Sequence, residues 1–171
     1  MAISMYKASA PIFVQILTAQ SGVLDKLAAH CEAKKQDPAF FMTMRLYPDM
    51  FNFARQVRAS TDHAVNACAR LAGVTPPTFP GEEATIPALK ERIATAVDFI
   101  KSLKAAQIDG TEEKEITFKV GQNERKMSGQ AMLLNFHFPN FWFHATTAYD
   151  ILRHCGVELG KRDFMGTPVT L

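Results

Sequence analysis

Apolar residues recur at steps of three and four along four stretches of the chain, which is the spacing of one buried helix face. The spacing predicts helices over residues 5–34, 48–71, 85–105 and 128–156. Pro11 lies early in the first stretch and is expected to bend that helix or to move its start later. Pro48 and Pro87 suit first turns, and Thr85 and Ser128 suit N-caps. The sequence therefore predicts an all-α domain of four helices.

A different pattern separates the third and fourth helices. Residues 115–120 alternate between apolar and polar side chains, residues 121–123 suit a turn, and residues 124–127 suit a second strand that runs back along the first. This pattern predicts a small β-hairpin before the fourth helix. The tail, residues 157–171, shows no period, and we expect an ordered coil anchored by Phe164 and Met165.

The fourth stretch carries most of the candidate chemistry. It holds the only Trp of the chain, and Pro139 in its middle predicts a kink or break. Residues 136–143 are apolar on nearly all sides, so the helix should be central, and its polar residues then need partners. These polar residues are His137, Asn140 and His144. They are either core groups with hydrogen-bond partners or the lining of a pocket.

The second stretch carries a polar stripe at heptad spacing: Asp49, Gln56 and His63. Such a stripe either borders the core or faces a central pocket. Because a buried histidine needs a partner, we expect Asp49 or Gln56 to contact the fourth helix near His144 or Asn140.

Composition narrows the class of protein. The 171 residues suit one domain, residues 1–171, with a real core. The net charge of +2 without a run of basic residues argues against a nucleic-acid partner, and the apolar patch at residues 11–17 is too short to span a membrane. The three cysteines lack metal-site spacing, which favours a reduced, cytoplasmic protein.

Three stretches resemble a known family: residues 45–60 (RLYPDMFNFARQVRAS), 89–94 (LKERIA) and especially 139–164 (PNFWFHATTAYDILRHCGVELGKRDF). Through them the whole chain resembles the DinB/YfiT-like superfamily and, within it, the domain-of-unknown-function family 1993. The resemblance implies an up-down-down-up four-helix bundle, often dimeric, with no established activity for this branch.

The wider superfamily includes thiol-dependent transferases and isomerases that bind a divalent metal through one His on the second helix and an H-x-x-x-H on the fourth. Laid on this chain, the pattern puts His144 on the second His of the pair and Asn140 on the first. No His lies early in the second helix, where Asp49, Asn52 and Gln56 are the oxygen donors, and His63 is expected to lie too far along it. Amides are poor ligands for zinc or nickel, so the metal site is read as degenerate.

Two functional hypotheses follow from the sequence. The first is a homodimeric bundle without a cofactor that either binds a small molecule in a polar-aromatic pocket around His144 or acts as a dimeric interaction protein. The candidate lining residues are Asp49, Gln56, His137, Asn140, Trp142, His144 and Tyr149. The alternative is a metal-dependent hydrolase or thiol-dependent transferase with zinc or nickel held weakly by His144, Asn140 and Asp49.

Overall fold

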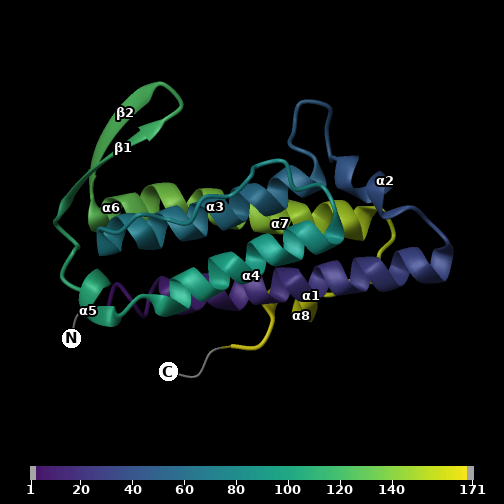
Figure 1. Cartoon of the computed structure of the whole chain (residues 1–171), viewed down its shortest axis with the longest axis horizontal. Coiled ribbons are helices and arrows are strands. Elements are labelled where there is room, and N and C mark those ends of the chain that lie inside the picture. The colour runs from purple at the N-terminus through teal and green to yellow at the C-terminus, as the bar shows by residue number, and fades with distance from the viewer. Residues whose placement is uncertain (1–2, 169–171) are drawn as a thin grey trace.

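Four long helices form a bundle in the computed structural model, which describes residues 3–168. They are α1 (Ala10–Lys34), α3 (Phe53–Ala72), α4 (Ile86–Ser102) and α7 (Phe138–His154). In Figure 1, α1 and α7 run in one direction while α3 and α4 run in the other. This is the up-down-down-up order that the resemblance implied. Between α1 and α3 lies the short helix α2 (Pro38–Thr43), and α5 (Ala105–Ile108) follows α4.

Large apolar side chains from the long helices meet along the bundle axis. The rings of Phe13 on α1 and Phe141 on α7 contact edge to face at 4.8 Å between centroids, and both side chains are fully buried. α3 packs against α7 with one face and against α4 with another. The side of α3 that faces α7 carries the candidate site described below.

The start of the second helix differs from the prediction. α3 begins at Phe53, because Asn52 is its N-cap and accepts a hydrogen bond from the Arg55 backbone N–H. The preceding loop is closed by the hydrogen bond from the Phe53 N–H to the Met44 carbonyl, 2.8 Å. Asp49 therefore lies exposed in a loop, and its placement on a helical stripe is wrong.

The other helix ends lie close to their predicted positions. α1 begins at Ala10, with Pro11 in its first turn, and not at residue 5. The Thr85 hydroxyl caps α4 as predicted, but the helix ends at Ser102 because Leu103 is extended.

The fourth helix runs from residue 129 to 154 with a local change of winding ahead of Pro139. It consists of α6 (Gly129–Met132), the π-helical turn η1 (Leu133–His137) and α7. In the π turn the Phe138 N–H bonds to the Leu133 carbonyl, five residues back. Proline has no N–H to continue the α-helical ladder, so the predicted break takes the form of this wider turn. The Ser128 hydroxyl caps the segment as predicted.

The hairpin is confirmed as β1 (Glu115–Val120) and β2 (Asn123–Ser128), paired antiparallel with Glu115 opposite Ser128. Ile116 and Phe118 of β1 are buried against the bundle. In the tail, a short helix α8 (Lys161–Met165) interrupts the expected coil, of which residues 169–171 lie outside the described part of the chain. Met165 is exposed while Phe164 packs on the core. No helix in residues 3–168 is both long and apolar enough to cross a membrane.

Candidate functional site

An aromatic column lies between α3 and α7. The imidazole of His144 stacks on Phe51 at one side and on His63 at the other, with ring centroids 5.8 Å and 5.7 Å apart. The Arg55 guanidinium covers the outer face of Phe51, 3.6 Å from the ring centroid. We call the set Arg55, Phe51, His144, His63, His137 and Arg70 the imidazole column.

The other end of the column is a hydrogen-bonded chain. The Nδ1 atoms of His63 and His137 lie 3.2 Å apart, and Arg70 Nη1 lies 2.9 Å from His137 Nε2. The Arg70 guanidinium also covers the ring of Phe118 from the hairpin, 4.5 Å from its centroid. The π turn places His137 here, with only 1% of the residue exposed. A guanidinium therefore closes the column at each end.

Heptad spacing on two antiparallel helices builds this arrangement. Gln56, His63 and Arg70 are seven residues apart on α3, and His137 and His144 are seven apart on the fourth helix. Because the helices run in opposite directions, Gln56 meets His144 and Arg70 meets His137, with His63 between them. Each side chain thus follows from helix register.

The hydrogen bonds fix the tautomers of two histidines. A guanidinium can only donate, so His137 Nε2 accepts from Arg70 and the proton of the neutral ring sits on Nδ1. That Nδ1–H donates to His63 Nδ1, which leaves the His63 proton on Nε2. Arg70 therefore determines, through His137, which nitrogen of His63 is a donor.

Gln56 fixes the tautomer of the third histidine. Its amide nitrogen donates to the Phe51 carbonyl at 3.2 Å, so Oε1 faces His144 and accepts from Nδ1–H at 2.6 Å. His144 Nε2 then carries a lone pair. Neither it nor His63 Nε2 has a partner among the described residues, and neither is a buried atom, so both reach the surface. The column offers one donor and one acceptor there.

All three imidazoles are held neutral. Burial lowers the pKa of His63 to about 4, with His144 and Arg70 adding to the shift. Burial, then His63 and Arg70, lowers the pKa of His137 to about 3. Burial and the Arg55 charge also lower the pKa of His144. The column thus combines two arginines with three uncharged bases at neutral pH.

The predicted contact between α3 and the fourth helix forms through Gln56, not Asp49. His63 was expected to lie too far along its helix to act as a metal ligand, but its ring reaches His144 and stacks on it. Its heptad spacing from Gln56 was the signal that could have placed it. Arg70, the next residue at this spacing, was missed entirely.

Besides Asp49, three predicted pocket residues do not join the column. The Asn140 amide donates to the Phe136 carbonyl of its own helix at 2.7 Å. Trp142 and Tyr149 pack on Phe164 of α8 instead. Trp142 and Tyr149 point to other sides of the helix than His144, whereas Asn140 shares the face of His144 but is engaged by its own backbone.

The donor set does not fit the metal site of the wider superfamily. Asp49 is exposed in a loop, the Asn140 amide is engaged by its own helix, and His144 Nδ1 is engaged by Gln56. Within residues 3–168 no three His, Cys, Asp or Glu side chains are grouped so that they could hold a metal ion. The residues present therefore favour a different use of the three imidazoles.

A small cavity of about 230 Å³ opens beside the Arg55 end of the column. Phe51, Arg55, Arg58 and Asp62 are among its lining residues. Asp62 is paired with Arg92, whereas no salt bridge of the described residues involves Arg55, Arg58 or Arg70. Arg58 lies near the Asp62 and Glu83 carboxylates, which share Arg92, so the positive charge without a nearby carboxylate at this end is that of Arg55.

Replacing His144 by alanine is expected to cost about 2–4 kcal/mol of stability, because it removes the stacking between Phe51 and His63 and leaves the buried Gln56 oxygen without a donor. Glutamine at this position keeps a donor and much of the volume, so it should cost noticeably less. Denaturant midpoints at unchanged slope measure both changes. Equal stability of the unsubstituted protein and the two variants would contradict a structural role for the His144 side chain.

Comparison with known proteins identifies a family to which this chain is similar. Residues 5–165 match the model of DUF1993, described as a domain of unknown function. The crystal structure of a DinB family member protein from Shewanella denitrificans superposes with a TM-score of 0.86 at 33% sequence identity, covering 97% of this chain and 94% of that one. No curated protein matches the chain.

Proposed function

This chain belongs to the DUF1993 family of DinB-like helical bundles, and we propose that it binds a small organic anion at the Arg55 end of the imidazole column. The observation that carries the proposal is the charge of the column. A guanidinium stands at each end and three neutral imidazoles lie between, while no described carboxylate pairs with Arg55, Arg58 or Arg70. An anionic guest supplies the missing partner.

The size of the cavity supports a small guest. Its volume of about 230 Å³ lies below the roughly 300–1,000 Å³ of pockets for drug-sized ligands. The Phe51 ring already contacts the Arg55 guanidinium and stacks on His144, so the guest is expected to bind through charge and not by stacking on Phe51. Arg55 and Arg58 provide the charge-assisted donors, which suits a simple carboxylate or phosphate.

His144 couples binding to pH. The Arg55 charge contributes to the lowered pKa of this imidazole, and an anion beside Arg55 opposes that effect. Binding therefore raises the pKa of His144 and favours uptake of a proton at Nε2. The affinity for an anion is expected to increase as the pH falls below about 6.5, the ordinary pKa of a histidine, because the pKa of His144 lies below that value without the anion.

Calorimetric titration with acetate, succinate, benzoate and phosphate at low ionic strength tests the proposal. At least one anion should bind at one per chain and weaken with added salt. Arg55→Gln should weaken that binding at least tenfold. Arg153→Gln, at an exposed arginine on α7 away from the column, is the matched control and should leave it unchanged. Binding by none of the four anions, or equal effects of the two substitutions, would refute the proposal.

The alternative of a metal-dependent hydrolase or transferase has a direct counter-test. Protein purified without a histidine tag or added metal should contain far less than one zinc or nickel per chain, since the donor set does not converge. Stoichiometric metal that is lost on His144→Gln would favour the alternative.

We also propose a two-fold homodimer, in which a second copy covers exposed apolar side chains. Phe40 on α2 and Leu46 and Tyr47 in the next loop are 54%, 42% and 66% exposed. This segment projects from the bundle at the end opposite the hairpin (Figure 1). α1 exposes no large apolar side chain, so we do not place the interface on this helix. Light scattering at micromolar concentration should give the mass of two chains, and the mass of one would contradict the dimer.

A further inference from the structure

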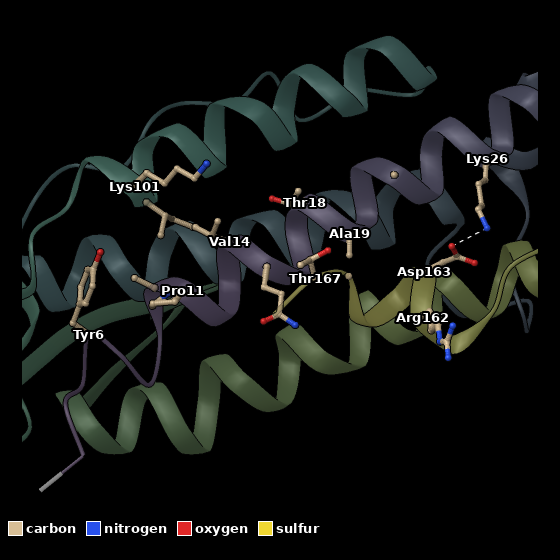
Figure 2. Close-up of a pocket in the computed structure, with 15 residues that line it drawn as sticks. Tyr6, Pro11, Val14, Thr18, Ala19, Lys26, Lys101, Arg162, Asp163 and Thr167 are labelled. Carbon is tan, nitrogen blue, oxygen red and sulfur yellow. Dashed lines mark ion pairs between the residues drawn. The ribbon is translucent and has the colours of Figure 1, made fainter. Parts of the chain in front are cut away.

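A long groove follows the outer side of α1, between α4 on one side and α8 with the tail on the other (Figure 2). Its volume is about 990 Å³, at the upper end of the range for ligand sites. The α1 residues that line it run from Ala10 to Lys26, which spans about 24 Å at 1.5 Å per residue. The groove shares no lining residue with the imidazole column.

Specific contacts hold the tail that walls the groove. Lys26 pairs with Asp163 at 2.8 Å, and the Gln15 amide donates to the Met165 carbonyl at 2.8 Å. Gly166 has φ +63°, and a Cβ there would meet the Cβ of Ala19 at 2.9 Å. Only glycine lets the tail lie this close to α1, so the wall is part of the fold.

The lining combines an apolar floor with unpaired positive charge. Ala10, Pro11, Val14, Ala19, Gly22 and Ile100 contribute apolar surface. Lys101 lies toward one end of the groove and Arg162 toward the other (Figure 2), and neither pairs with a carboxylate among the described residues. The only acidic lining residue, Asp163, is committed to Lys26. A guest that fits has a long apolar body and an anionic end.

The hollow shape argues against a second copy as the occupant. A two-fold axis brings the same patch of both copies together, so groove would face groove and leave a void. At Gly22 the groove is open, since a Cβ added there would meet nothing within 4 Å. A flexible chain fills such a space better than the same concave surface does.

We propose that this groove is a second binding site, which takes a long-chain carboxylate of the fatty-acid class. The acyl chain lies along the floor formed by α1, and the carboxylate pairs with Lys101 or Arg162. The site is independent of the anion site at the imidazole column, because the two share no residue and differ in the size of guest they admit.

Fluorescence titration of the full chain with cis-parinaric acid, kept below its micellar concentration, tests the proposal. We expect saturable binding of one molecule per chain and displacement by palmitate. Gly22→Leu should weaken binding at least tenfold, because the new side chain enters open space in the groove. The substitution also replaces an exposed helical glycine by a better helix former, so the variant should fold.

Ala28→Leu is the control, because it also places a leucine on α1 but at an exposed residue outside the groove. It should leave binding unchanged. Replacing Lys101 and Arg162 together by Gln should weaken palmitate about tenfold and leave the neutral alcohol hexadecanol unaffected. Equal binding by the two leucine variants would overturn the proposal, as would absence of saturable binding. A change from two chains to one in light scattering on Gly22→Leu alone would assign the groove to a second copy instead.

Discussion

Replacing Arg92 by alanine is expected to destabilise the fold by about 3–5 kcal/mol, the largest effect of any single change considered. Its side chain is 2% exposed. It donates to the Thr61 hydroxyl at 2.6 Å, to Glu83 at 2.8 Å and to the Asp62 carboxylate, and it covers the ring of Phe79. Removal leaves the Glu83 carboxylate, 7% exposed in its side chain, without its salt-bridge partner.

Lys90→Ala is the matched control for this change. Lys90 lies on the same helix and pairs with Asp25 at the surface, so its loss should cost less than about 1 kcal/mol. Adding Glu83→Gln to Arg92→Ala should recover part of the loss, since no buried charge then remains. Urea midpoints of the variants measure these differences, and costs below about 1 kcal/mol for Arg92→Ala would contradict the network.

Acidification below pH 6.5 is expected to produce the second large effect. An unfolded histidine titrates near 6.5, whereas the pKa of His137 is lowered to about 3 and that of His63 to about 4. The unfolded chain therefore takes up protons first as the pH falls. Stability is full above about pH 6.5 and declines until the folded pKa values are reached. For His137 alone the loss is about 2–3 kcal/mol near pH 4.5.

The groups that face these two rings strengthen the effect. Arg70 lies against His137, the ring of His144 lies on His63, and Arg125 covers the neighbouring Phe136. No carboxylate among the causes of either shift favours the protonated form. His137→Gln should flatten the dependence of stability on pH between 6.5 and 4.5. His154→Gln, at an exposed histidine, should preserve it, and identical pH profiles for both variants would refute the assignment.

Local patterns were sufficient to predict most of the helices and the hairpin. The capping residues Thr85 and Ser128 and the alternation in residues 115–120 act over a few positions, and the structure follows them. The start of α3 could not be predicted in this way. Pro48 satisfies the local rule for a first turn, but Asn52 competes as a cap and the hydrogen bond between Phe53 and Met44 closes the loop.

The candidate site was predicted in part because helix register decides it. Gln56 and His144 were identified from a polar stripe that needed a partner in an apolar helix, and the pair forms. His63 and Arg70 continue that stripe, but which residues of two antiparallel helices lie level depends on loop lengths and on the π turn before Pro139. Trp142 and Tyr149 were grouped with His144 by sequence proximity, and helix geometry turns them toward α8.

The anion site on the imidazole column is tested most directly by long-range ¹H–¹⁵N correlation spectra of the histidine side chains at pH 7. Without ligand, the proton should reside on Nδ1 in His137 and His144 and on Nε2 in His63. On saturation with the tightest-binding anion of the panel, the resonances of His144 should shift and its Nε2 should take up a proton at a higher pH than without ligand, while His137 stays unchanged. Resonances of His144 that do not respond to a bound anion would contradict the site.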